Sequence, residues 1–397
     1  MKIKYTLLAL AASTALLASC QDAKLSSKSD RAYIAQTGTQ AGRIGSLTLG
    51  EDGASIDLNV RLSDVQTADQ SYTLELSQEA LDQYNKRNKT SYTLLPAAQV
   101  TIPGSEVVIK AGSVFSDPLT VKLKPLTTEQ SKSGKKYAVA FRLTPKGGSL
   151  PVIEGADTYV YGIKTVTVTT APILGTYRGQ YYKAKAVGLP VVELPRFTVE
   201  MRVNMNGFRR NNQALFGSFH SGSEIYMRFG DANPPYNYLN IKFGAGGQID
   251  RTFDGAQPNT WYHIALVYDG AQARLYVNGA LITTTDKPAG RVFTLAETLH
   301  IAGSGMTWFV NSCMFSELRI WNVVRTPEQL KDNEYVVDPS TPGLLHYWRM
   351  DEGQGREFAN SVKGMPPLKV MDGYDKDQTP VWVSNVRSDG QGTTRVP

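Results

Sequence analysis

The stretch W-Y-H-I-A-L-V-Y-D-G-A-Q-A-R-L-Y-V-N-G-A-L-I-T-T-T, residues Trp261–Thr285, decides the fold. Its first part, Trp261–Tyr268, alternates between two faces that both carry apolar side chains, as in a strand buried inside a sandwich. Two further strand-like runs follow, at Ala273–Val277 and Leu281–Thr285. Between them stands Asn278-Gly279, a pair that tolerates positive φ at both positions and therefore favours a tight hairpin. We expect an antiparallel three-stranded meander.

The order and spacing of W-x-H-x-A-x-x-Y-D-G and L-Y-V-N-G resemble the central hairpins of laminin-G-like, concanavalin-type jelly-roll domains. Phe315–Trp321 and the following Val324–Leu330 are similar to the late strand and short helix of that family, with Thr326 as the helix N-cap. Leu345–Gly355 is similar to its closing strand and acidic glycine turn. The resemblance implies a jelly roll over residues 172–384.

The same resemblance bears on metal binding. The family often has Asp where this chain has Ser316 and Asn360. Replacing carboxylates by these residues removes hard oxygen ligands, so a calcium site, which some relatives carry, is placed in doubt. We expect no cofactor and no metal site, with calcium left open as the alternative.

The N-terminus carries targeting signals. Lys2 and Lys4 precede an apolar core, Leu7–Ala18, which is too short to span a bilayer and predicts a secretion signal. Leu17-Ala18-Ser19-Cys20 resembles a bacterial lipobox, which implies removal of residues 1–19, a lipid on Cys20 and a tether over 20–30. The alternative is an ordinary signal with a chance cysteine. The lipobox implies a lipid-anchored protein of the outer membrane, at the cell surface.

Charge and cysteine content exclude other classes. Removing Lys2 and Lys4 leaves 40 basic against 36 acidic residues, a formal charge of +4. No block of Lys and Arg could follow a phosphate backbone, so nucleic acid is not an expected partner. With Cys20 lipidated, Cys313 is the only other cysteine and no disulfide can form. We expect contact with the membrane through the lipid alone.

Residues 31–171 predict a separate β-sandwich with one helix, for which Ser77 is a suitable N-cap and Asn88 the end. The runs L-D-Q-Y-N-K-R-N-K-T-S-Y-T-L-L-P and V-V-I-K-A-G-S resemble a Bacteroidetes lipoprotein domain that often precedes family-18 endoglycosidases. Thr170-Ala171-Pro172 marks the expected boundary, and a polar tail is expected over 385–397. The fold class is therefore all-β, with two sandwiches and one short helix in each.

Acidic motifs do not favour catalysis. Jelly-roll glucanases use E-x-D-x-x-E on one strand, and this chain has no such run. Glycines interrupt the cluster of Asp351, Glu352 and Glu357. The D-x-x-D-x-D spacing of residues 372–377 lacks the terminal Glu of the family-18 pattern. The four histidines show no metal-ligand spacing. A glycoside hydrolase with an unrecognised acid pair remains an alternative.

Loop aromatics and amides favour binding, because sugar sites stack apolar ring faces on aromatic side chains and read hydroxyl groups with polar ones. Three loops offer such residues, whereas Trp261, Trp321 and Trp348 are expected in the core. The predicted ligand-binding residues are Trp308 in Gly303–Trp308, Tyr236, Asn237 and Tyr238 in Asp231–Tyr238, and Arg209, Arg210 and Asn212 in Phe208–Asn212.

The sequence thus predicts a non-catalytic surface lipoprotein that binds a polysaccharide or N-glycan within a glycan-utilisation system. Components of an outer-membrane glycan importer are expected partners besides the glycan. Besides the hydrolase, a protein-binding adhesin or a structural subunit of a transport complex remains open.

Overall fold

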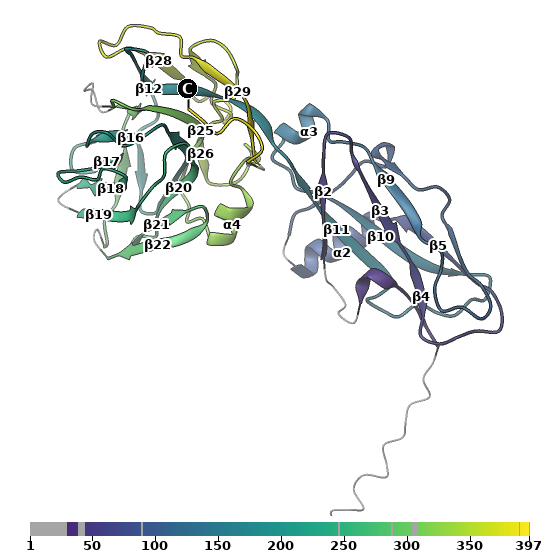
Figure 1. Ribbon diagram of the computed structural model, residues 1–397. Helices are drawn as coiled ribbons and strands as arrows, with labels where there is room; N and C mark the ends of the chain where they lie inside the picture. Colours follow the sequence, from purple (N-terminus) through teal and green to yellow (C-terminus); the bar gives the residue numbers. More distant parts are fainter. Residues whose placement is uncertain are drawn as a thin grey trace, which may run out of the picture. The chain divides into compact units, whose positions relative to one another are not determined.

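The computed structural model describes residues 30–38, 44–88, 90–244, 247–286, 289–303, 309–388 and 390–396 (Figure 1). The predicted signal peptide, Cys20 and the tether up to residue 29 lie outside these ranges. The chain forms two compact units. The first holds residues up to 47 together with 53–124 and 137–163, and the second holds 48–52, 125–136 and 164–397.

The first unit is built from mostly antiparallel strands with one helix against them. Its main sheet has the order β2-β11-β10-β5-β8, with β6 pairing β10, and a second sheet has the order β3-β9-β7. The strands are β1 (Ala32–Ile34), β2 (Ile44–Leu49), β3 (Ala54–Leu58), β4 (Val60–Leu62), β5 (Gln70–Leu76), β6 (Thr93–Leu94), β7 (Val100–Thr101), β8 (Glu106–Ile109), β9 (Leu119–Leu123), β10 (Tyr137–Lys146) and β11 (Thr158–Thr165).

Helix α2 (Gln78–Asn88) covers one side of β10. Leu81 and Tyr84 share a hydrophobic cluster with Ala140 of that strand. The Ser77 hydroxyl accepts a hydrogen bond from the Ala80 amide at 3.1 Å, which confirms the predicted N-cap. Two single-turn 3-10 helices, η1 (Ala35–Thr37) and η2 (Ala97–Gln99), complete the unit.

The second unit is a jelly roll. Its hydrogen-bonded path has the order β19-β18-β17-β16-β24-β13-β12-β25-β15-β20-β21-β22. The strands are β12 (Val168–Tyr177), β13 (Gln180–Val187), β14 (Val192–Leu194), β15 (Phe197–Met205), β16 (Gln213–Ser218), β17 (Ile225–Phe229), β18 (Tyr238–Phe243), β19 (Gly247–Asp254), β20 (Trp261–Tyr268), β21 (Ala273–Val277), β22 (Ala280–Thr285), β23 (Phe293–Leu295), β24 (Thr298–Ile301), β25 (Ser312–Trp321), β26 (Leu344–Trp348), β27 (Glu357–Phe358), β28 (Leu368–Met371) and β29 (Trp382–Arg387).

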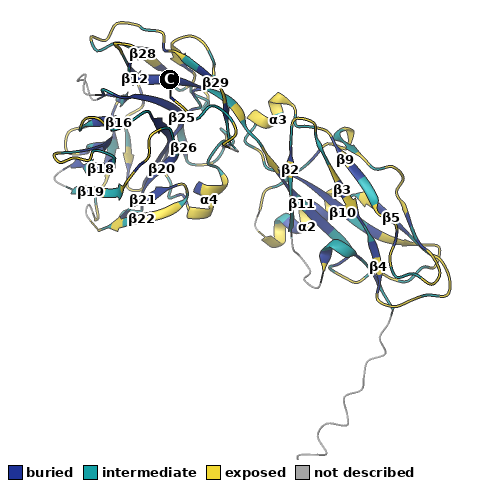
Figure 2. Cartoon of the chain, viewed as in Figure 1, coloured by how far each residue is buried: buried dark blue, intermediate teal, exposed yellow. Residues whose placement is uncertain are grey.

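Strand β13 joins the two layers of this unit. Its first part, Gln180–Tyr182, pairs with β12, and its second part, Ala184–Val187, pairs with β24. One core fills the space between the layers and contains Val199 of β15, Leu266 of β20 and Ile241 of β18. In Figure 2 strands β20 and β25 are dark blue, as expected for strands buried on both faces.

The meander predicted from the opening stretch is confirmed. Strands β20 and β21 have the predicted bounds, and β22 begins one residue earlier, at Ala280. Asn278 and Gly279 have φ values of 50° and 75°, and this left-handed pair makes the tight turn. One face of β20 enters the main core, while Ala265 and Val267 on the other face pack with Leu330.

Leu330 belongs to helix α4 (Pro327–Asp332), whose predicted N-cap, Thr326, accepts a hydrogen bond from the Gln329 amide. A second helix of this unit, α3 (Thr128–Lys132), was not expected, so one helix in each unit is a correction. Its T-x-x-Q capping box, Thr127 with Gln130, was readable in the sequence. Within the described ranges, no helix is long and apolar enough to span a membrane.

Both ends of the second unit differ from expectation. The boundary lies near residue 163 because β12 pairs with β25 and β29. The expected polar tail is packed where it is described: Val386 and Val396 are buried in the main core. The Val396 amide donates a hydrogen bond to Asn259 Oδ1 at 3.0 Å. The C-terminal segment is therefore part of the jelly roll.

Candidate functional site

The sheet formed by β13, β24, β16, β17 and β18 has one face turned away from the core, here called the outer face. Strand alternation defines it, because neighbours of each outer residue, such as Met227 and Leu299, lie in the core. Tyr226 and Arg228 of β17 and His300 of β24 project on the outer side. These three residues are polar or aromatic, as a sugar-binding surface requires, and Tyr226 and Arg228 are themselves 5% and 6% exposed.

Phe219 is the exposed aromatic residue of the outer face. It directly follows β16 and is 40% exposed. Its ring lies against Gly217, where a Cβ atom would come within 2.5 Å of the phenyl carbons. The centroid of the Phe219 ring lies 5.5 Å from that of Tyr226 and 5.6 Å from that of His300. A glycine therefore makes room for a supported aromatic ring that still presents surface to solvent.

A second exposed ring stands beyond β13. Tyr374 is 85% exposed and occupies a turn whose backbone amides, those of Tyr374 and Lys376, donate to Asp372 Oδ1. Asp375 Oδ1 ties this turn to β13 through Lys183 Nζ at 2.6 Å and Lys185 Nζ at 2.7 Å. These hydrogen bonds lower the pKa of Asp375, so the carboxylate stays ionised at neutral pH.

His300 lies between strands β13 and β16. Lys185 is its partner in the β13–β24 pairing, and Gly217 is its partner in the β16–β24 pairing. Burial, followed by the positive charges of Lys185 and Lys183, lowers the pKa of His300 to about 4. The imidazole is therefore neutral at pH 7 and can both donate and accept a hydrogen bond. Its Nδ1 atom has no hydrogen-bond partner among the described residues.

Two of the three predicted loops meet beside Tyr226. Asn212 Oδ1 accepts hydrogen bonds from Tyr226 Oη at 2.6 Å and from Arg228 Nη1 at 2.7 Å. Arg228 Nη2 pairs with Asp231 of the other loop at 2.7 Å. Asn212 is thus a positioning residue of the loop cluster, and its carboxamide oxygen is already engaged.

The remaining residues of the first loop lie at the surface. Arg209 and Arg210 are both exposed. The Arg209 amide donates to Asn311 Oδ1 at 2.9 Å, and its Nη2 atom donates to the Val310 carbonyl at 3.2 Å. The loop therefore has fixed backbone and outward cationic groups. Trp308, predicted on the third loop, lies outside the described residues.

The second loop corrects one expectation. Tyr238 is 2% exposed, and its hydroxyl accepts from the Asp231 amide and donates to the Asn233 carbonyl. The Arg251 guanidinium lies 4.9 Å from its ring centroid, so this ring is not a free stacking face. Tyr236 and Asn237 are half-buried, and Asn237 Nδ2 donates to the Ala256 carbonyl.

The acidic clusters of the sequence have structural partners. Asp377 pairs with Arg356, and Glu357 pairs with Lys369. Glu352 Oε1 accepts from the Ala359 amide. Burial raises the pKa of Glu352, but this hydrogen bond gives the carboxyl a structural role in its turn. None of these contacts forms a carboxyl pair of the kind that glycosidases use.

A buried ionic cluster that joins β15, β20 and β25 was not predicted. The Glu200 carboxylate is fully buried and receives Trp321 Nε1 at 2.7 Å and His263 Nε2 at 2.8 Å. Arg319 Nη1 lies 3.4 Å from the same group. Burial acts to raise the pKa of Glu200, but Arg319 and His263 outweigh burial and lower it to about 2. Sequence periodicity could not reveal this cluster, since its members come from three separate strands.

Among the described residues, no group of three His, Cys, Asp or Glu side chains is placed to hold a metal ion. The two positions at which the family resemblance implies Asp hold Asn360 and Ser316. Asn360 Oδ1 accepts from the Tyr347 and Val362 amides, and Ser316 is buried on β25. Cys313 and the rings of Trp321 and Trp348 are fully buried as expected, whereas Trp261 is half-buried.

Family models match both parts of the chain. Residues 177–331 match the model described as the concanavalin A-like lectin/glucanases superfamily, of the laminin G type. Residues 26–150 match the model of an N-terminal domain. The match over 26–150 covers most of the first unit, and the match over 177–331 covers much of the second unit and agrees with the jelly-roll resemblance.

Relatives of known structure and sequence cover different shares of the chain. A candidate carbohydrate-binding protein from Bacteroides ovatus has a TM-score of 0.60 and 23% identity, covering 88% of this chain and 99% of that one. Human pappalysin-1 is 25% identical over 203 residues, which are 43% of this chain and 12% of that protein. Mouse pappalysin-1 is 25% identical over 174 residues, or 38% and 10%. The chain thus spans a small part of these two relatives, whereas the Bacteroides protein shares the fold of nearly the whole chain.

Proposed function

We propose that this chain, whose second unit carries a concanavalin A-like lectin/glucanase domain, binds glycans without cleaving them, on the outer face around Phe219. The observation that carries the proposal is an exposed phenyl ring supported by Gly217, Tyr226 and His300. A pyranose has an apolar face that stacks on such a ring and hydroxyl groups that need polar partners at its edge. His300, neutral at pH 7, and Lys185 supply those partners.

The surface extends in two directions from Phe219. Through Tyr226 and Asn212 it reaches the loops that carry Arg209, Arg210 and Tyr236. Through Lys185 and Asp375 it reaches Tyr374. A surface of this kind suits several linked sugars rather than one. Asn237 and Asn212 remain predicted contacts or supports along it, and Trp308 remains a predicted contact outside the described residues.

Binding without hydrolysis is the favoured form of the function. A general acid must hold a proton near neutral pH, and Asp375, which pairs with Lys183 and Lys185 of β13, has a lowered pKa. Asp231 is paired with Arg228. The proposed binding requires no metal or other cofactor.

The cellular role follows from the signals at the chain's start. With a lipid on Cys20, the protein would be held at the outer membrane and exposed at the cell surface, with the first unit as spacer or docking module. Within a glycan-utilisation system it would pass captured chains to importer components. The name of the Bacteroides ovatus structure, a candidate carbohydrate-binding protein with the same fold, supports the glycan ligand.

A glycan array followed by affinity electrophoresis of the purified chain tests the proposal. Retention by at least one class of polysaccharide or N-glycan is the expected result. Release of reducing sugar from that glycan would establish the hydrolase alternative instead. Failure of every glycan to retain the protein would favour the adhesin or structural-subunit reading.

A further inference from the structure

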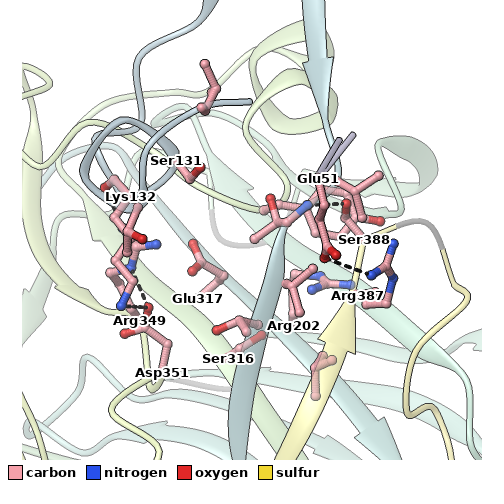
Figure 3. Close-up of a pocket in the computed structure, with 18 residues that line it drawn as sticks. Glu51, Ser131, Lys132, Arg202, Ser316, Glu317, Arg349, Asp351, Arg387 and Ser388 are labelled. Carbon is pink, nitrogen blue, oxygen red and sulfur yellow. Dashed lines mark hydrogen bonds and ion pairs between the residues drawn. The ribbon is translucent and has the colours of Figure 1, made fainter. Parts of the chain in front are cut away.

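A cavity of about 230 Å³ lies in the second unit, away from the outer face, and the proposed function does not use it (Figure 3). Strands β15 and β25 line it with Arg202, Ser316 and Glu317. Arg349 and Asp351 follow strand β26 and line another side, and Lys132 comes from α3. The volume is below the roughly 300–1,000 Å³ of sites for drug-sized ligands, so a ligand would be about one sugar ring in size.

The cavity has buried polar atoms without partners. Ser316 is 3% exposed, and its hydroxyl has no hydrogen-bond partner among the described residues. The same holds for Arg202 Nε, whose nearest carboxylate oxygen, Glu334 Oε1, is 3.6 Å away. Buried polar groups are nearly always hydrogen-bonded, and exceptions call for an explanation. A ligand that accepts hydrogen bonds would supply the missing partners.

Arg202 is held in place for such a contact. Its guanidinium carbon lies 4.8 Å from the ring centroid of Trp261 and 4.2 Å from that of Tyr335. Packing between two aromatic rings fixes the planar group before any ligand arrives, so little side-chain entropy remains to be lost on binding.

The charges around the cavity are already paired with one another. Asp351 pairs with Arg349 at 3.3 Å and with Lys132 at 3.6 Å. Arg387 pairs with Glu51 at 3.4 Å, as the dashed lines in Figure 3 indicate. Glu317 pairs with Arg319 and receives the Tyr347 hydroxyl at 2.6 Å. An ionic ligand would have to compete with these pairs, whereas a neutral one would not.

We propose that this cavity is a second binding site, for one neutral sugar ring, separate from the outer face. Ser316 and Arg202 donate to ring hydroxyl oxygens, and the carboxylates of Glu317 and Asp351 accept from the hydroxyl hydrogens. The site would hold a terminal or free monosaccharide, because the cavity has no room for a chain. It does not depend on the outer face binding glycan.

Saturation-transfer NMR and calorimetry with methyl glycosides of the common neutral hexoses and of N-acetylglucosamine test the site. The double variant Phe219→Ala/Tyr374→Ala of the full chain is used beside the unchanged protein, so that binding on the outer face does not mask the cavity. At least one glycoside should bind both proteins at millimolar concentration. Ser316→Ala, introduced into each protein, should weaken that binding about fivefold, the effect of one lost hydrogen bond.

Ser316→Leu, which fills the cavity, should abolish the binding. Ser223→Ala is the matched control, since Ser223 is also buried but does not line the cavity, and it should change nothing. Because Ser316→Leu could unfold the chain, melting curves accompany it and Ser316→Ala carries the test on its own. Equal binding by Ser316→Ala and the unchanged protein, or no glycoside bound at 50-fold molar excess and millimolar concentration, would overturn the proposal. Loss of glycan binding on the outer face alone would not contradict a sugar site in the cavity.

Discussion

The phenyl ring of Phe219 lies 5.6 Å from the imidazole ring of His300, although 81 residues separate the two in the chain. Pairing of β16 with β24 brings them together, and Gly217 opposite His300 leaves the space that the phenyl ring occupies. The arrangement gives an exposed aromatic surface with a neutral polar ring at its edge. The predictions below follow from this surface and from the groups that support it.

Replacing Asp375 by Asn should weaken glycan retention about threefold, the loss expected when a single charge-assisted contact no longer positions a binding residue. The change removes the carboxylate that ties the Tyr374 turn to Lys183 and Lys185. Stability should fall by about 1–2 kcal/mol, because the largely buried Lys183 loses its ionic partner. Affinity electrophoresis and urea denaturation measure the two effects.

Asp377→Asn is the matched control for that experiment. Asp377 belongs to the same turn region but pairs with Arg356 through exposed groups, for which small effects are expected. If both variants behaved alike in retention, Asp375 would have no special part in placing Tyr374.

Acid should destabilise the second unit through His346. Its ring is buried and stacked on Trp348, and burial lowers its pKa to about 4. The unfolded state therefore binds more protons than the native state between about pH 6.5 and pH 4. The stability that His346 contributes is complete above that window and is lost as the pH falls through it, by up to about 3 kcal/mol. Urea midpoints at pH 7.5 and 4.5 give the difference.

His346→Phe keeps an aromatic ring on Trp348 and removes the titrating group, so the midpoints at the two pH values should move closer together. Part of the acid effect should remain, because the pKa of His300 is also lowered to about 4. His220→Phe, at an exposed position, should leave the pH dependence as it is. An unchanged pH dependence in His346→Phe would contradict the assignment.

Glu200→Gln should destabilise the protein by about 3–5 kcal/mol, the usual cost of removing one member of a buried ion pair. The change leaves the fully buried Arg319 beside a neutral amide and disturbs the acceptor of Trp321 Nε1. Urea denaturation measures the loss. Glu193→Gln, at an exposed position of β14, is the control and should change stability by less than about 0.5 kcal/mol. Similar losses of stability in both variants would show that the buried ionic cluster around Glu200 has little part in stability.

Local signals in the sequence were enough to predict the architecture. Asn278-Gly279 fixes its turn by backbone chemistry, Thr326 caps its helix, and the alternation in Trp261–Tyr268 identifies a strand buried on both faces. These features depend on neighbours within a few residues. The capping box of α3, at Thr127 and Gln130, was equally local and could have been recognised.

Features that depend on pairing between distant strands could not be predicted. The support of Phe219 by His300 requires the β16–β24 register, and the buried state of Glu200 requires β15, β20 and β25 together. Tyr238 was expected to present its ring, but it begins β18 and its hydroxyl closes its own loop. The second ring, Tyr374, could have been predicted as exposed, because it stands in the turn sequence D-G-Y-D.

The most direct test of the central claim is affinity electrophoresis in a gel containing the best glycan from the array. Phe219→Ala/Tyr374→Ala is compared with the unchanged protein and with Phe115→Ala, which removes a 49% exposed ring from the first unit. The double variant should lose at least tenfold in affinity, since stacked aromatic contacts contribute about 0.5–1.5 kcal/mol each beyond the area they bury. Phe115→Ala should migrate like the unchanged protein. Equal retention of all three would contradict glycan binding on the outer face.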